Sequence, residues 1–137
     1  MKQRITVEAL VHAPIDKVWK CWTLPEHITK WNNASDDWHT PRAENNLTKG
    51  GKFTMRMEAK DGSFGFDFGG EYTEVQHHEI IQYVLEDNRA VKIEFSGNGA
   101  VTKVVETFEA ESENSLELQQ AGWQAILNNF KKYVENN

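Results

Sequence analysis

The sequence predicts an α+β fold in which a curved six-stranded antiparallel sheet surrounds one long C-terminal helix. Five stretches in the middle of the chain favour strands and are separated by short turns, a pattern typical of antiparallel pairing. One alternating stretch opens the chain and is followed by two short amphipathic segments. The C-terminal stretch repeats apolar residues at helical spacing, which predicts a helix with one buried face.

The N-terminal part is expected to form a strand and two short helices. Alternate residues are apolar over 5–11, which predicts a strand with one buried face. Pro14 suits the first turn of a helix, and the apolar residues of 15–22 recur at helical spacing. A second short helix is expected to carry Ile28 and Trp31 toward the core.

The segment 32–49 has no periodicity and is expected to be a long loop, a feature that is often functional. Asp36, Asp37 and His39 lie together in it. They fit either an acid/base group at the mouth of a cavity or a polar loop whose aspartates form local turns, and we favour the local turns.

The remaining five strands and the closing helix follow from alternation and turn signals. Gly69 and Gly70 lie inside one strand and indicate a bulge or a close approach of two backbones. The closing helix carries an apolar stripe from Leu116 to Val134. The five strands are expected at residues 52–57, 64–72, 80–85, 91–95 and 102–109.

A mismatch in width predicts a cavity between sheet and helix. A helix is about 10 Å across, whereas six strands at ~4.8 Å spacing are more than twice as wide, so the sheet must curl. The remaining space must hold large side chains or a ligand, and the chain has five Trp, seven Phe and three Tyr. Gly122, next to Trp123, removes side-chain bulk from the helix and leaves room there.

Composition and charge argue against several classes of function. The net charge is −6 and 15 basic residues are scattered among 21 acidic ones, so we expect no nucleic-acid partner. No stretch approaches the ~20 apolar residues of a membrane span. The single cysteine, Cys21, fits a reducing cytosol, and a cytoplasmic location is expected. No metal-ligand spacing occurs, so neither metal nor cofactor is expected. The length favours one domain over residues 1–137.

Candidate ligand-binding residues are the large side chains expected on the dry face, with one histidine from the long loop. Small-molecule sites are mostly apolar with a few placed polar groups, and the polar candidates are Arg56, Glu106, Tyr72 and His39. Tyr72 is favoured, because a buried phenol needs a partner. The predicted set is Trp31, Trp38, His39, Phe53, Met55, Phe66, Phe68, Tyr72, Tyr83, Phe95, Trp123 and Leu127, and no catalytic residue is assigned.

These motifs resemble the SRPBCC (START-like, helix-grip) superfamily, and more closely its Aha-type branch, named after the activator of the heat-shock chaperone ATPase. The resemblance covers nearly the whole chain and is specific for fold rather than function. It lies in the opening Ile5-x-Val7-x-x-x-Val11-x-Ala13-Pro14-x-x-x-Val18-Trp19-x-x-Trp22-Thr23-x-Pro25-Glu26-His27-x-x-x-Trp31, in Gly50-Gly51-Lys52-Phe53, in Gly70-x-Tyr72-x-Glu74-Val75, and in Gly122-Trp123-x-x-x-Leu127-x-x-Phe130.

The resemblance implies a hydrophobic ligand cavity, and relatives in the superfamily bind lipids, polyketides or flavonoid-like aromatics. We therefore expect a binding protein for a small hydrophobic, aromatic or polyketide- or lipid-like molecule rather than an enzyme. Two alternatives stay open. One is a cyclase or hydrolase acting on an aromatic substrate. The other, implied by the branch name, is a protein that modulates a chaperone ATPase, although no residue of the chain supports a chaperone partner.

Overall fold

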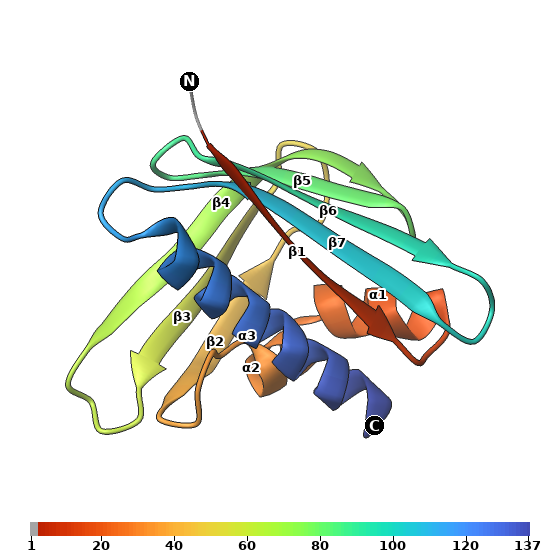
Figure 1. Ribbon diagram of the computed structural model, residues 1–137, viewed down its shortest axis with the longest axis horizontal. Coiled ribbons are helices and arrows are strands. Elements are labelled where there is room, and N and C mark those ends of the chain that lie inside the picture. Colours follow the sequence, from red (N-terminus) through yellow and green to blue (C-terminus); the bar gives the residue numbers. More distant parts are fainter. Residues whose placement is uncertain (1–2) are drawn as a thin grey trace.

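The computed structural model describes residues 3–137 and confirms the α+β prediction. Within that part of the chain there are seven strands and three helices, and the long helix is the last element (Figure 1). In chain order they are β1 (Arg4–Val11), α1 (Ile15–Thr23), α2 (Pro25–Trp31), β2 (Trp38–Asn45), β3 (Lys52–Ala59), β4 (Gly65–Gln76), β5 (Ile80–Leu85), β6 (Ala90–Gly97), β7 (Thr102–Glu109) and α3 (Leu116–Glu135).

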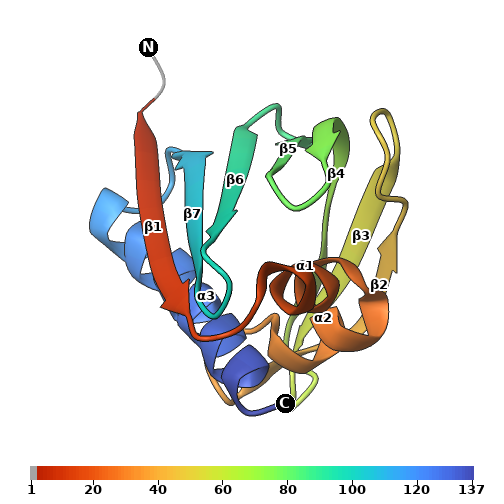
Figure 2. The same ribbon diagram turned by 90° about the vertical axis from the view of Figure 1, so that its right-hand side faces the viewer.

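All seven strands form one antiparallel sheet in the order β1-β7-β6-β5-β4-β3-β2. The first strand thus lies beside the last one, while the other strands follow their order in the chain. The sheet curls around α3, and the short helices α1 and α2 lie together at one end of the curled sheet (Figure 2). None of the helices in residues 3–137 is long and apolar enough to cross a membrane.

The prediction of six strands is wrong, because β2 lies inside the segment that was expected to be a loop. It is an edge strand that pairs only with β3, and its register shifts between His39 and Arg42. An edge strand that is largely solvated needs no apolar alternation, and it tolerates Pro41 because no second strand among residues 3–137 pairs with it. The usual sequence signals of a strand are therefore missing from this segment.

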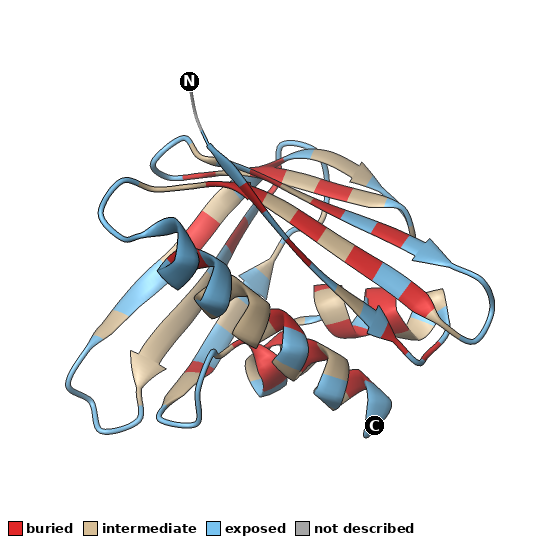
Figure 3. Cartoon of the chain, in the orientation of Figure 1, coloured by how far each residue is buried: buried red, intermediate tan, exposed pale blue. Residues whose placement is uncertain are grey.

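The concave face of the sheet carries the core. Burial alternates along β5, β6 and β7, so that every second residue points to the inside (Figure 3). The C-terminal half of α3 seals one end of this core, since Phe130 packs against Trp22 and Trp31 with ring centroids 4.8 Å apart in both pairs. Further toward the N-terminus of α3, the Trp123 ring stacks on Phe108 of β7 at 3.9 Å.

The two glycines of β4 lie where three backbones approach closely. A Cβ atom on Gly70 would lie 2.6 Å from the carbonyl oxygen of Val84 and 3.1 Å from the ring of Phe53. A Cβ on Gly69 would lie 2.8 Å from the carbonyl oxygen of Phe53. A register shift follows directly, between Tyr72 and Glu74. The expected close approach is therefore confirmed, and a bulge accompanies it.

Candidate ligand cavity

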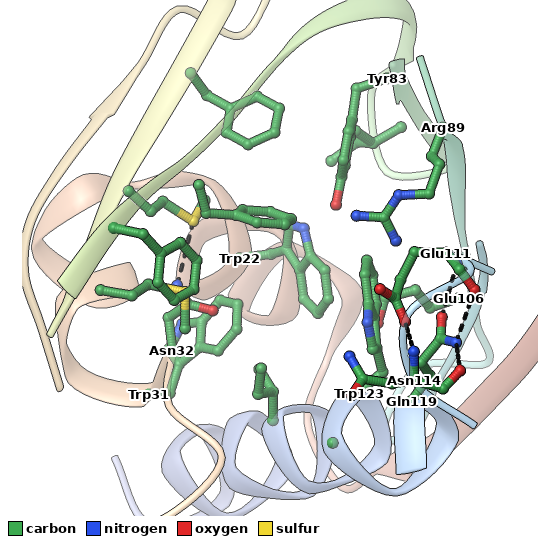
Figure 4. A pocket seen from close by; sticks show the side chains of 18 of the residues that line it. Trp22, Trp31, Asn32, Tyr83, Arg89, Glu106, Glu111, Asn114, Gln119 and Trp123 are labelled. Carbon is green, nitrogen blue, oxygen red and sulfur yellow. Dashed lines mark hydrogen bonds between the residues drawn. The ribbon is translucent and has the colours of Figure 1, made fainter. Parts of the chain in front are cut away.

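A cavity of about 380 Å³ lies between the N-terminal half of α3 and the concave face of the sheet (Figure 4). The sheet is wider than the helix, and α3 packs mainly along the β1 side of the sheet, so the space facing β3, β4 and β5 is left uncovered. The lining residues are Trp22, Trp31, Asn32, Phe53, Met55, Met57, Phe66, Phe68, Tyr72, Ile81, Tyr83, Arg89, Glu106, Glu111, Asn114, Leu118, Gln119, Gly122, Trp123 and Ile126.

Aromatic and methionine side chains form most of one wall. Alternation along β3 and β4 directs their large side chains to the same face, where Phe53 lies 6.1 Å from Phe68 and 4.7 Å from Tyr83 between ring centroids. Phe68 in turn meets Trp123 of α3 at 6.2 Å. These rings create a flat-sided, apolar space.

The cavity opens to solvent between β4 and the start of α3. Two of its lining side chains are strongly exposed, Phe66 at 40% and Leu118 at 60%. Gly122 lies one helical turn beyond Leu118, and a Cβ atom placed on it would meet no atom within 4 Å. The absence of a side chain at this position therefore leaves part of the cavity open, as the sequence predicted.

Two of the polar residues in the lining have their hydrogen-bonding groups occupied by the protein. The Tyr72 hydroxyl donates to Asn45 Oδ1 at 2.5 Å, and burial raises the pKa of this phenol. Gln119 holds the connection between β7 and α3: its side chain accepts from the backbone N–H of Glu111 and donates to the carbonyl of Asn114, both at 2.9 Å. The hydrogen bonds of these two side chains therefore stabilise the fold.

Glu106 is the buried carboxyl group of the cavity. It lies in β7 on the concave face, is only 6% exposed, and pairs in register with Ile93 on one side and Val7 on the other. Burial removes water from the carboxylate and raises its pKa to about 8, so the side chain is largely protonated at neutral pH. The residues described in the structure donate no hydrogen bond to it.

Tyr83 and Arg89 point into the same end of the cavity (Figure 4). Tyr83 lies in β5, and burial raises the pKa of its phenol well above the ordinary value, with a further contribution from Glu106. Arg89 lies in the turn after β5 and its Nε donates to Asp87 Oδ2 at 2.7 Å. The cavity is therefore apolar on the side of β3 and β4 and polar on the side of β5 and β7.

Eight of the twelve predicted ligand-binding residues line this cavity, and four do not. Their contact with a ligand stays a prediction. Phe95 packs against Trp19 and Trp22, and Leu127 is buried in the core. Trp38 is not part of the lining and packs against Phe64 and Phe66, while His39 Nε2 lies 3.8 Å from Glu58 Oε1. The eight are Trp31, Phe53, Met55, Phe66, Phe68, Tyr72, Tyr83 and Trp123.

Several lining residues were not in the predicted set. Ile126 lies one position before Leu127, and the helix turns Ile126 rather than Leu127 toward the cavity. Trp22 belongs to the apolar repeat that predicted the first short helix, and it also lines the cavity. Arg89 comes from a turn, and no pattern in the sequence aims a turn residue inward. Of the four polar candidates, Glu106 and Tyr72 line the cavity, whereas Arg56 pairs with Glu58 and Asp67 outside it.

The group weighed as an acid/base alternative, Asp36, Asp37 and His39, does not line the cavity. Asp36 and Asp37 are exposed, and the His39 side chain is 43% exposed. His77 and His78 lie in the turn after β4, where their rings stack on each other at 3.8 Å and meet the Trp19 ring edge-on at 5.3 and 5.9 Å. Among residues 3–137, no group of three His, Cys, Asp or Glu side chains is arranged to hold a metal ion.

A comparison with known protein families shows to which family the chain belongs. The family described as "Activator of Hsp90 ATPase homolog 1-like protein" matches residues 12–135. The chain belongs to this family. The match confirms the Aha-type resemblance noted from the sequence, and members of this fold family often bind ligands.

Solved structures of relatives have the same fold. The solution structure of the AHSA1-like protein from Aeromonas hydrophila is 45% identical, covers 98% of this chain and 93% of its own, and has a TM-score of 0.92. A solution structure from Cytophaga hutchinsonii is 54% identical with the same coverage and a TM-score of 0.84. A crystal structure from Nitrosomonas europaea, 17% identical, covers 97% of this chain and 94% of its own at a TM-score of 0.81 and shares the fold. Comparison with curated proteins gave no match.

Proposed function

We propose that this protein binds a small, flat, hydrophobic molecule in the cavity between α3 and the sheet. The observation that carries the proposal is the cavity itself: about 380 Å³, open to solvent at Phe66 and Leu118, and walled largely by aromatic and methionine side chains. Ligand sites for small molecules have this size and this composition, with a few placed polar groups. Aromatic rings such as Phe68 and Trp123 favour a partner that is itself flat and conjugated.

A titration with a library of hydrophobic aromatic metabolites, followed by thermal unfolding and by NMR chemical shifts, tests the proposal. A ligand at 100 times its dissociation constant stabilises the fold by about 2.7 kcal/mol, which raises Tm by roughly 5–10 °C. The backbone amides that shift are expected in α3 near Gly122 and in β3 to β5. A library in which no compound raises Tm or shifts these amides would remove the proposal.

A matched pair of helix variants separates binding in the cavity from binding elsewhere. Gly122→Leu places a side chain in the cavity and should abolish the rise in Tm. Ala121→Leu adds the same side chain to the exposed face of the same helix and should leave the ligand response unchanged. Equal responses of both variants would show that the ligand binds outside the cavity.

The family description provides a second candidate, modulation of the Hsp90 ATPase. The observation that favours it is an exposed aromatic cluster formed by Trp38, Phe64 and Phe66, whose ring centroids lie 6.0 to 6.3 Å apart. Phe64 is 61% exposed, and exposed apolar patches are typical of interaction surfaces. An unchanged Hsp90 ATPase rate after addition of this protein would exclude the second candidate.

A further inference from the structure

The polar end of the cavity consists of three side chains from three separate elements. Glu106 comes from β7, Tyr83 from β5, and Arg89 from the turn between β5 and β6. Glu106 and Tyr83 lie on the same concave face, with β6 between them. Their partners in β6 are two residues apart, since Glu106 is opposite Ile93 and Tyr83 is opposite Val91. We call these three residues, Tyr83, Arg89 and Glu106, the donor end.

Two of these groups have no hydrogen-bonding partner among residues 3–137. Glu106 is 6% exposed and Tyr83 is 8% exposed. Within residues 3–137, the Glu106 carboxyl and the Tyr83 hydroxyl form no hydrogen bond. Every side-chain N or O atom that is fully buried in this part of the chain does have a partner, so these two groups are not fully buried. Their polar atoms therefore face the cavity rather than the packed core. A ligand group that forms hydrogen bonds with these atoms is therefore stabilised at this end of the cavity.

The hydrogens of the donor end determine the kind of ligand group that it can satisfy. The Arg89 guanidinium is a donor only, and its Nη atoms are not used by the ion pair that its Nε makes with Asp87. The Tyr83 phenol keeps its proton at neutral pH, and burial keeps the Glu106 carboxyl largely protonated, so each also has an O–H to donate. Three donors that line one end of the cavity favour a ligand acceptor there.

The charge balance at this end argues against an anion. The positive charge of Arg89 is matched by Asp87 at 2.7 Å, and the carboxylate of Glu111 lies on the same side of the cavity. A carboxylate placed here would lose its hydration without meeting surplus positive charge, which is costly in a buried site. A neutral acceptor, such as the oxygen of a conjugated ketone, accepts two hydrogen bonds at a much lower desolvation cost.

We propose that Tyr83, Arg89 and Glu106 form a donor end that binds the carbonyl oxygen of a flat, neutral aromatic ketone and discriminates against the matching aromatic carboxylate. This proposal rests on the proposed function and adds the ligand's chemical class and its orientation. The ring system lies against the aromatic wall of β3 and β4, and the ketone oxygen points toward β7.

Three matched probes test the proposal by isothermal titration calorimetry at pH 7: 2-acetylnaphthalene, 2-ethylnaphthalene and 2-naphthoate. They share one flat ring system and differ in the head group, which is a ketone, a hydrocarbon or an anion. With a net contribution near 1 kcal/mol for each of the two hydrogen bonds that the ketone oxygen accepts, the ketone should bind about thirtyfold more tightly than the hydrocarbon. The carboxylate should bind more weakly than the ketone.

Variants then assign the preference to the donor end. Tyr83→Phe and Glu106→Leu should each reduce the preference for the ketone over the hydrocarbon by about fivefold to tenfold. Glu106→Gln keeps an N–H donor and should retain most of that preference. Tyr133→Phe is the control, because the Tyr133 hydroxyl bonds His27 at 2.6 Å, outside the cavity lining. NMR spectra of each variant check that the fold is intact.

The outcomes distinguish this proposal from the proposed function. Equal binding of ketone and hydrocarbon, unaffected by Tyr83→Phe, would overturn the donor end while leaving a hydrophobic binding protein. Tightest binding of 2-naphthoate would overturn it in favour of an anion site. If none of the three probes binds and none of the library compounds does, both proposals fail together.

Discussion

Glu106→Gln should change how the stability of this protein depends on pH. The pKa of Glu106 rises from 4.5 in the unfolded chain to about 8 in the fold, so folding takes up a proton over this range. Glu106 is only 6% exposed. Its contribution to stability is fully present below pH 4.5 and is lost as pH rises through 8, because the unfolded state then ionises while the fold resists ionisation.

The size of the effect follows from the two pKa values. Between these two pKa values, the unfolding free energy of the wild type falls by about 1.4 kcal/mol for each pH unit. At pH 7 it is therefore about 3 kcal/mol lower than that of a chain with a neutral side chain at position 106. Glutamine has the same shape and no charge. The difference in unfolding free energy between Glu106→Gln and wild type should therefore grow by about 3 kcal/mol from pH 6 to pH 9 and level off above pH 8.

Urea denaturation at pH 6, 7, 8 and 9, followed by tryptophan fluorescence, measures this difference. The test is the change of this free-energy difference with pH, because any effect of glutamine on packing adds the same free energy at every pH. Glu71→Gln is the matched control, because Glu71 is an exposed glutamate of β4, and its difference from wild type should stay constant. A constant difference for Glu106→Gln as well would refute the interpretation that this carboxyl is held protonated by burial.

Two further predictions concern the walls of the cavity. Gly122→Ala should raise the unfolding free energy by roughly 0.5–1 kcal/mol, because alanine favours the helix and its Cβ meets no atom within 4 Å; a loss of stability in urea denaturation would show that the position is not open. Tyr72→Phe should lower the unfolding free energy by about 1 kcal/mol through loss of the hydrogen bond to Asn45; thermal unfolding without a decrease in Tm would contradict the importance of that bond.

Much of the fold could be predicted because the period of the apolar residues directly reports which face of an element is dry. The alternation in β1, β3, β6 and β7 and the helical stripe of α3 are local properties, and the structure confirms the elements they predict. For β5 the sequence is apolar on both sides, so only the pairing with β4 and β6 decided that Ile81, Tyr83 and Leu85 face inward. The edge strand β2 was missed because its half-solvated backbone imposes no pattern on its side chains.

The candidate site was predicted in kind but not in detail. The width of the sheet against a single helix and the number of aromatic residues indicated a cavity, and eight predicted residues line it. The rotation of α3 about its own axis turned Ile126 toward the cavity and Leu127 into the core, a choice of one position that the stripe alone leaves open. Arg89 enters the cavity from a turn, where no periodicity exists to predict its direction.

The sequence by itself determined the α+β class, the order of most elements and the presence of a cavity wall rich in aromatic rings, since these depend on local periodicity and composition. Only the tertiary structure decided which polar groups share the inside of that cavity. Glu106, Tyr83 and Arg89 are brought together by strand register and by the curl of the sheet, and these arise from pairing between segments distant in the chain. The burial that keeps a carboxyl group protonated there likewise comes from its neighbours in space.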